Sequence, residues 1–493
     1  MTCEGYEATL TRKSRPLGTR FRRQQISLES EHAQSRAQDE PGLPVELSAL
    51  GETFDDEVCR DLFHHARTCT LEDLETAPSP TDFWYIYAMP FSHSHQAVRH
   101  AICALGGAHR VFKLQRSGSP TALQTIQQVS LRQYNLAIGS IKNLMGTSTA
   151  TDITTILTCC VIFISLENIY GHYAESLRHL KAGSSLLTSW SACLSDRSAL
   201  SRPSQQVLNN FAQTLCRLGD DVWGYVREMI APELNCYFAT DDRTSYTGEQ
   251  FETVDAAEQA LHNITKLFEA EQSVVQRKFL AYAQYGYSSY QRHFMPAGGP
   301  PAHDGLSFEV LSGRFEQWSR SFDRFRQIFA EHHRSAKDTM RIRALAVDQA
   351  LWTGWLRCNA WRDYQEEDLN EIVQRAEELA RLEAFKSGPV FAFDGSFILC
   401  IAMACVTTTD SDTQWRAIRL LRSVWRREGI WDSQELADIL EAMVHATSSG
   451  LLSKDMLPWD VPHLARMLES LSLNNVRIPV GPLSLVDHRS TEK

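Results

Sequence analysis

Cysteine and histidine are the residues of this chain most suited to metal chemistry, and two groups of them stand out. The first group, Cys59, His64, His65 and Cys69, offers four side chains of the types that bind zinc. If one helix carries them, Cys59 and Cys69 point to different faces, and their spacing matches no zinc-finger pattern. The sequence therefore predicts ordinary packing roles for this group.

The second group is the densest in histidine and contains His93, His95, His100 and His109. His95 and His100 are five residues apart, which is roughly 140° around an α-helix, so they do not share a face. A zinc-protease helix instead carries its two histidines four residues apart. We predict helix-start and packing roles for these histidines as well.

The amino end reads Met1-Thr2-Cys3-Glu4-Gly5-Tyr6, and the next cysteine after Cys3 is Cys59. A zinc-thiolate site needs a full set of converging ligands, so Cys3 can bind zinc only if a longer chain supplies the others. Residues 8–25 then carry six basic side chains and no acid, namely Arg12, Lys13, Arg15, Arg20, Arg22 and Arg23. Three interpretations stay open for this stretch: an arm that contacts DNA phosphates, a nuclear import signal, or a solvated linker.

The chain has no Gly-rich phosphate loop ending in Lys-Ser or Lys-Thr, no Gly-x-Gly-x-x-Gly fingerprint and no Gly-x-Ser-x-Gly nucleophile elbow. We therefore predict no enzyme activity and no cofactor in this chain. Zinc is expected only in a longer form with a full cluster.

Composition is that of a folded globular protein, with 43% hydrophobic and 22% charged residues. The net charge is −11, and because residues 8–25 are basic, the remainder carries −17. Attraction to nucleic acid is therefore expected only at the amino end. The twelve cysteines are scattered rather than arranged as a disulfide framework, which is typical of a reducing compartment.

The longest apolar run, Ile156 to Leu166, is shorter than the roughly 20 residues that a membrane helix requires. It predicts a buried core helix. The amino end is polar and lacks the apolar core of a secretion signal. We therefore expect an intracellular protein with no membrane partner.

Helical periodicity dominates after residue 45, and strand-like alternation is rare. Apolar residues recur at steps of three to four, or their multiples, in the stretches Val98, Ile102, Leu105 and Phe112; Leu131, Tyr134, Ile138 and Ile141; and Tyr173, Leu177, Leu180 and Leu187. Asp152 is the predicted N-cap of the apolar helix. Residues 193–210 and 237–256 are more polar and predict loops, and the Pro- and Gly-rich residues 293–305 predict a break between two lobes.

Near the carboxyl end, Trp415, Ile418, Leu421 and Trp425 predict a helix whose last turn holds Arg426 and Arg427. Asp432 with Glu435 three residues later predicts the start of the next helix, and Ile430 and Trp431 should pin the corner between the two. The predicted fold class is all-α, a large multi-helix bundle or superhelical array. The predicted domains are a zinc-cluster remnant with a basic flexible linker (1–45), a helical domain (46–480) and a disordered tail (481–493).

Three stretches resemble the helical regulatory domain of fungal Zn2Cys6 transcription factors, in the same order along the chain. They are His95 to Gly106; Tyr134 to Ile138 with Gly171 to Tyr173 and His179 to Gly183; and Arg426 to Ser433. Cys3-Glu4-Gly5-Tyr6 is similar to the end of the zinc cluster in that family, here truncated to its last cysteine. The resemblance implies an all-helical domain that regulates a DNA-bound factor in the nucleus. The five missing cysteines put autonomous DNA binding in doubt.

Two functions follow from the resemblance. One is a transcription-factor-like regulator of a metabolic or secondary-metabolite gene cluster, whose zinc cluster comes from a longer native chain. The other is a helical co-regulator without DNA binding of its own, which borrows a zinc cluster from related transcription factors. A homodimer or a heterodimer with such factors is expected in either case. The aromatic stripes at 315–325 and 415–431 could line an effector pocket, but core packing explains them more simply.

Overall fold

The computed structural model describes residues 56–74, 83–115, 117–145, 149–193, 202–226, 250–270, 308–330, 335–357, 364–382, 385, 388–393, 395 and 397–453. In chain order its elements are α1 (Glu57–His65), a π-helical turn (Ala66–Thr70), α2 (Leu71–Leu74), a second π-helical turn (Trp84–Ala88), α3 (Met89–Ser94), α4 (Gln96–Leu114), α5 (Pro120–Leu144), α6 (Ala150–Tyr170), α7 (Tyr173–Cys193), α8 (Arg202–Val226), α9 (Val254–Ala270), α11 (Phe308–Ala330), α12 (Ala336–Arg357), α13 (Glu366–Ala380), β1 (Val390–Ala392), α15 (Phe397–Thr407), α16 (Ser411–Ser423), β2 (Arg426–Glu428), β3 (Trp431–Asp432) and α17 (Ser433–Ser448).

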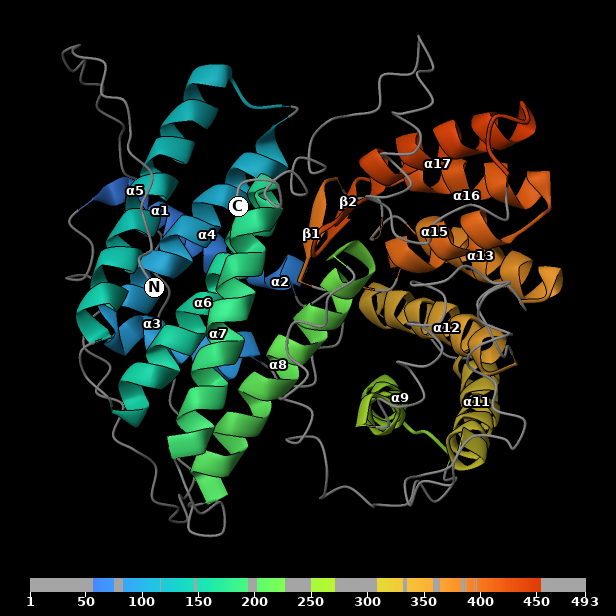
Figure 1. Ribbon diagram of the computed structural model, residues 1–493, viewed down its shortest axis with the longest axis horizontal. Helices are drawn as coiled ribbons and strands as arrows, with labels where there is room; N and C mark the ends of the chain where they lie inside the picture. Colours follow the sequence, from blue (N-terminus) through green and yellow to red (C-terminus); the bar gives the residue numbers. More distant parts are fainter. Residues whose placement is uncertain are drawn as a thin grey trace, which may run out of the picture.

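The helices form two groups that meet at a small sheet (Figure 1). Helices α1 to α8 make the amino-terminal group, and α11 to α13 with α15 to α17 make the carboxyl-terminal group. One hydrophobic core runs through both groups, and across the seam the ring of Phe112 lies 6.4 Å from that of Phe391, and Trp84 lies 5.5 Å from Phe393. The predicted all-α fold class is confirmed.

Helix α6 lies at the centre of the amino-terminal group, as its apolar sequence predicts, and its side chains are almost all buried. The predicted N-cap is wrong. Thr149 is the N-cap, because its hydroxyl accepts the backbone N–H of Asp152, while Asp152 stands three residues later as the acidic partner. Within the described part of the chain, Thr151–Tyr170 is the stretch long and apolar enough to cross a membrane, and 89% of it is buried inside the protein.

A second, smaller core forms between α9, α11 and α12. The stripe Phe315, Trp318, Phe322 and Phe325 is buried there, and the indole N–H of Trp318 donates to the carbonyl of Ala257 at 2.9 Å. The buried indole thus has the polar partner that it needs. Core packing accounts for this stripe.

The predicted loops and boundaries have mixed outcomes. Helix α8 begins at Arg202, so the expectation of a loop over 193–210 is wrong for its last nine residues. Apolar side chains such as Leu208 and Phe211 bury one face of α8, and a polar start concealed this pattern. Helix α9 begins at Val254, inside the predicted loop 237–256. The proposed lobe break at 293–305, the linker before residue 46 and the tail after residue 480 lie outside the described residues.

The placement of Arg426 and Arg427 in a helix end is also wrong. Helix α16 ends at Ser423, and the two arginines lie in strand β2, which pairs parallel with β1 and antiparallel with β3. The side-chain amide of Gln434 satisfies the last carbonyls of α16 by donating to Leu421 at 3.2 Å and to Val424 at 2.6 Å. The arginines are therefore not needed at this helix end.

The corner between α16 and α17 follows the prediction more closely. Asp432 is the N-cap of α17 and accepts the backbone N–H groups of Gln434 and Glu435 at 2.9 and 3.1 Å. Ile430 and Trp431 are both buried. They lie in a short β-hairpin rather than in a bare helix–helix turn.

Candidate functional site

Residues from the second and third family-like stretches meet at the carboxyl-terminal end of α6. Helix α6 ends at Tyr170, and Gly171 follows with φ of 77°, a left-handed conformation that glycine adopts without strain. The N–H of Gly171 donates to the carbonyl of Asn168 at 3.1 Å, and that of His172 donates to the carbonyl of Glu167 at 2.9 Å. These bonds close the last turn but leave this helix end with a partial negative charge.

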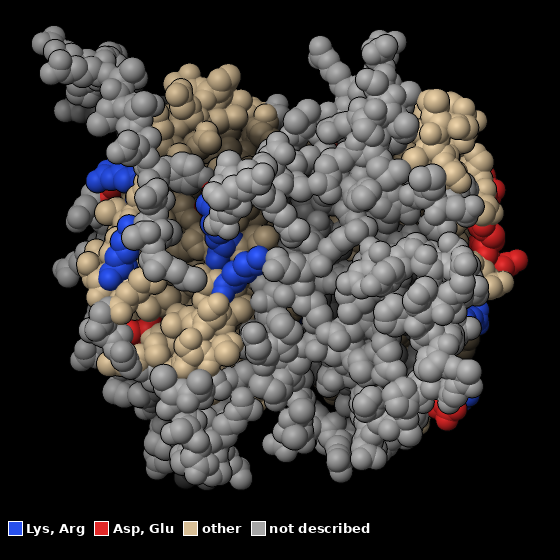
Figure 2. Space-filling view, viewed as in Figure 1, with Lys and Arg blue, Asp and Glu red and all other residues tan. Residues whose placement is uncertain are grey.

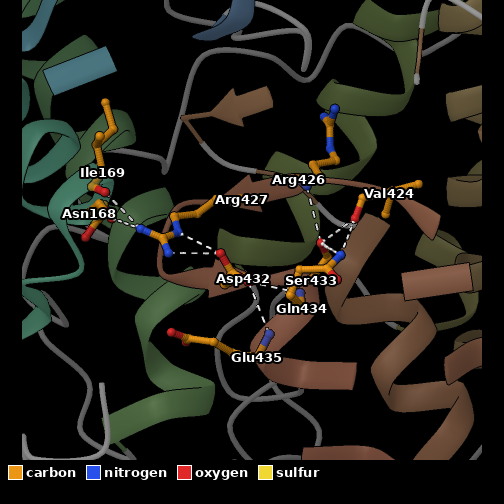
Figure 3. Close-up of polar contacts among 9 residues, drawn as sticks. All are labelled: Asn168, Ile169, Val424, Arg426, Arg427, Asp432, Ser433, Gln434 and Glu435. Atoms are coloured by element: carbon orange, nitrogen blue, oxygen red, sulfur yellow. Dashed lines mark hydrogen bonds and ion pairs between the residues drawn. The ribbon is translucent and has the colours of Figure 1, made fainter. Parts of the chain in front are cut away.

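Arg427 neutralises that helix end from the other half of the molecule (Figure 3). Its Nη1 donates to the carbonyls of Asn168 and Ile169 at 3.2 and 2.9 Å. Its Nε and Nη2 donate to Oδ2 of Asp432 at 3.1 and 2.9 Å. We call the Arg427–Asp432 pair, with the α6 carbonyls that Arg427 contacts, the α6 clamp.

The α6 clamp links two helix ends of opposite polarity. Oδ2 of Asp432 accepts from Arg427, while its Oδ1 caps the amino end of α17. Arg427 and Asp432 are only 14% and 16% exposed, so water screens their attraction weakly. The order is α6 carbonyls, guanidinium, carboxylate and α17 amides, and each neighbour has the opposite sign.

Glu167 forms the polar centre on the inner side of the same helix end. It is 1% exposed, and its Oε1 accepts from the hydroxyl of Tyr134 at 2.7 Å. Its Oε2 lies 2.9 Å from Nδ1 of His172, and this hydrogen bond raises the pKa of His172. Nε2 of His179 lies 2.8 Å from the Tyr134 hydroxyl, while burial lowers the pKa of His179. A neutral His179 can therefore donate to the tyrosine that donates to Glu167.

Sequence reasoning missed Glu167, although a signal was present. It is the only Asp, Glu, Lys or Arg between Asp152 and Glu175, within an otherwise apolar helix. A carboxylate at such a position is almost never buried unless it has partners. Its direct partners are Tyr134 and His172, and His179 contacts Tyr134; all three belong to the stretches that resemble the fungal regulatory domain.

A second buried carboxylate, Glu428, lies on the other side of the sheet. It is 1% exposed, forms an ion pair with Arg426, and accepts the N–H of Ile398 at 2.9 Å at the start of α15. A Cβ at Gly395 would come within 2.5 Å of the Glu428 carboxyl carbon, so glycine makes room for it. The guanidinium of Arg426 also lies over the ring of Phe385, 4.8 Å from its centroid.

Glu435 lies beside the α6 clamp at the first turn of α17. Burial, and next the charge of Asp432, raise the pKa of Glu435 to about 7. The charges of Asp432 and Glu435 together also act on Tyr173, whose pKa is raised chiefly by burial. The junction thus contains one carboxyl group, Glu435, that titrates near neutral pH, and a histidine, His172, whose pKa is raised by its bond to Glu167.

The histidines considered as metal ligands separate in the structure. His100 contacts the amide of Gln133 at 2.6 Å, and His95 stacks on Phe91 with 4.9 Å between ring centroids. His109 contacts Thr70 and Asp73 in the core. Among the residues that the structure describes, no three His, Cys, Asp or Glu side chains gather as a metal site requires.

The first cysteine and histidine group is also dispersed. Cys59 is buried, and its sulfur accepts from the Gln133 amide at 2.9 Å. Cys69 is half-buried and His64 is exposed. Burial lowers the pKa of His65 to about 4, so this histidine is neutral at physiological pH.

Thr70, His109 and Asp73 have the order of a hydroxyl, base and acid array. His109 Nδ1 lies 3.1 Å from the Thr70 hydroxyl, and its Nε2 lies 3.0 Å from Oδ2 of Asp73. Thr70 and His109 are both fully buried, so a substrate cannot reach them. Lys113 pairs with Asp73 at 2.7 Å and donates to the carbonyl of Pro389 at 2.7 Å, so the array ties α4 to the residue before β1.

The sequence-predicted site residues at the amino end, Cys3, Arg12, Lys13, Arg15, Arg20, Arg22 and Arg23, lie outside the described residues. Among the described residues, the structure brings together side chains of the second and third stretches that resemble the fungal regulatory domain. The first stretch, His95 to Gly106, forms most of α4, which packs on α5 and α6.

Comparison with known proteins gives one domain match and two relatives. Residues 50–215 match the fungal specific transcription factor domain. The aspercryptin biosynthesis cluster-specific transcription regulator atnN of Emericella nidulans is 35% identical over 91 residues, which are 18% of this chain and 15% of that protein. The transcription regulator lscL of Purpureocillium lilacinum is 28% identical over 101 residues, 19% of this chain and 24% of that protein. The chain thus spans less than a quarter of either relative, and no solved structure matches it significantly.

Proposed function

We propose that this chain, whose residues 50–215 match the fungal specific transcription factor domain, regulates the transcription of a biosynthetic gene cluster in the nucleus. The domain match is the observation that carries the proposal, because it covers α1 to α7 and the first half of α8, including Glu167 and its partners. Both relatives are named as transcription regulators, one of them specific to a biosynthesis cluster. These names point to regulation rather than to any enzyme class.

In this proposal the helical body is the regulatory part, and the α6 clamp fixes how its two groups of helices face each other. A regulator must change between at least two states, and a signal shifts them only by binding one state better. The contacts of Arg427 with the carbonyls of Asn168 and Ile169 cross between the two groups, while its contact with Asp432 lies inside the hairpin of β2 and β3. Loss of the two contacts with α6 would weaken this polar link, while the shared apolar core still joins the groups.

DNA contact, zinc and partners belong to the proposal as well. Cys3 would be a zinc ligand only in a chain that supplies the other thiolates, and the basic side chains from Arg12 to Arg23 would then contact phosphates or serve nuclear import. A homodimer, or a heterodimer with a related transcription factor, would provide the second DNA contact. The alternative is a co-regulator without DNA binding of its own, which pairs with complete relatives and titrates or recruits them.

The proposal is tested by deleting the gene and by tagging the protein in the organism that encodes it. We expect the transcripts of a contiguous set of biosynthetic genes to fall together, the tagged protein to lie in the nucleus, and chromatin immunoprecipitation to enrich the promoters of those genes. Unchanged transcripts combined with a protein outside the nucleus would refute it. A strain that expresses R427M tests the role of the α6 clamp, with R381M as the matched arginine variant at an exposed position.

A further inference from the structure

Helix α5 presents an outer face with an unusual composition for this acidic protein. Thirteen of its residues are exposed, of which seven are Thr, Gln or Asn, two are the bases Arg132 and Lys142, and none is acidic. Leu136 is the large apolar residue of the helix that is exposed, with a relative exposure of 42%. The face therefore offers hydrogen-bond donors and positive charge with little apolar area.

The lack of acid extends well beyond α5. Residues 83–151 contain six Lys or Arg and no Asp or Glu, although the whole chain has a net charge of −11. The net charge of the whole chain does not reveal this region. Residues 83–151 are therefore an acid-free region in addition to the basic amino end. Figure 2 shows Lys and Arg side chains gathered over the amino-terminal helices, with few Asp or Glu side chains among them.

Arg132 and Lys142 also differ from many bases of the carboxyl-terminal group in their pairing. Arg416 and Arg422 are held by Glu377 and by Asp438 with Glu441, respectively. Within the described part of the chain, no carboxylate forms an ion pair with Arg132 or Lys142, and both side chains are exposed. Their charge is available to an anionic partner.

We propose that the outer face of α5 lies against the phosphate backbone of DNA when this regulator occupies its target. The inference rests on the proposed function. Phosphate contacts in protein–DNA complexes come from Arg and Lys and from Ser, Thr, Asn and Gln side chains, which is the composition of this face. The composition of the face favours DNA over an apolar protein surface as the partner. Hydrogen-bonding and basic side chains outnumber exposed large apolar side chains along the helix.

The dimensions of α5 fit this occupant. Its 25 residues extend about 37 Å, close to the roughly 34–36 Å of one turn of B-DNA. Arg132 and Lys142 are ten residues apart, so their Cα atoms are separated by about 15 Å along the axis. The two bases would therefore reach different phosphates, and they add affinity without reading sequence.

The experiment uses the purified 493-residue chain and a fluorescein-labelled 30-base-pair duplex of arbitrary sequence. Fluorescence anisotropy gives the binding constant between 20 and 150 mM KCl for the wild type and for R132A/K142A. Each lost phosphate contact should reduce the slope of log K against log salt by about 0.9, so the double variant should be less steep by about 2. R132K/K142R keeps both charges and should keep the wild-type slope.

The matched control is K337A/R419A, which removes two exposed bases from α12 and α16. It should leave the slope unchanged, and so should the circular dichroism spectrum of every variant. Equal slopes for the wild type and R132A/K142A, or no binding even at 20 mM KCl, would overturn the inference. If R132A/K142A instead abolished expression of the target genes with an unaltered slope, the face would bind a protein and not DNA. The transcript and localisation tests of the proposed function are independent of all these outcomes.

Discussion

Replacement of Arg427 by methionine tests the α6 clamp directly. Methionine retains an unbranched apolar side chain but removes the charge and every donor. Two carbonyls of α6 lose a hydrogen bond, and Asp432 loses the guanidinium that approaches it to 2.9 Å. Asp432 remains 84% buried beside the raised-pKa carboxyl of Glu435, without its counter-charge.

The expected loss of stability follows from this burial. Removing one partner of a buried ion pair costs about 3–5 kcal/mol, and because both partners keep slight exposure we expect R427M to lose about 3 kcal/mol. D432N keeps an oxygen to cap α17 and leaves Arg427 bonded to the two α6 carbonyls, so we expect a smaller loss of about 1–2 kcal/mol. The double variant R427M/D432N has no unpaired charge, and its loss should fall short of the sum by more than about 1 kcal/mol.

Urea unfolding followed by tryptophan fluorescence gives these free energies. Hydrogen exchange adds a local measure, since peptides covering 165–173 and 426–436 should exchange faster in R427M. The control is R381M, because Arg381 is 72% exposed and lies 3.7 Å from Glu377. Such a surface pair contributes less than about 0.5 kcal/mol at this geometry. The reasoning is refuted if R427M is as stable as R381M, or if the R427M and D432N losses simply add.

Three further predictions concern pH and packing. Burial and then a neighbouring carboxylate raise the pKa of Glu435 to about 7, so the folded state retains a proton that the unfolded state releases above about pH 4.5. The free energy of unfolding of the wild type should therefore fall as pH rises from 5 to 8. At pH 8, E435Q should be more stable than the wild type by up to about 3 kcal/mol, measured by urea unfolding. The pKa of His172 is raised by its buried acceptor, so its contribution is present at low pH and lost as pH rises; H172Q should be more destabilising at pH 6 than at pH 9 by the same assay. G106A places a Cβ 2.3 Å from a backbone carbonyl of α1 and should cost at least about 2 kcal/mol, whereas G139A meets nothing and should stabilise by about 0.5–1 kcal/mol in thermal unfolding.

Helical periodicity was sufficient to predict the fold class because it is a local property of each segment. The apolar residues of α6 predicted a central buried helix, and Asp432 predicted the start of α17. Arg426 and Arg427 show the limit of such reasoning. Two bases after an apolar period suit a helix end, but the carbonyls that Arg427 contacts belong to α6, more than 250 residues earlier in the chain.

The candidate site depends on the same kind of long-range pairing. A lone Glu167 in an apolar helix predicts that partners exist, but not which residues they are. Those partners, Tyr134 and His172, come from the helix before α6 and from the turn after it. The site residues predicted at the amino end stay a prediction, because they lie outside the described residues.

The chemistry of the seam explains why a buried polar pair sits there. Contacts such as Phe112 with Phe391 stabilise the seam, but apolar surfaces tolerate small shifts in register. The guanidinium of Arg427 is planar and donates to two α6 carbonyls and to one carboxylate at once. Because the directions of its N–H groups are fixed, these acceptors must lie in one particular arrangement. A signal that moved α17 and its hairpin relative to α6 would therefore have to break the hydrogen bonds from Arg427 to the α6 carbonyls first. The free energy of these bonds, rather than the buried apolar area, would then set how strongly an effector must bind to switch this regulator.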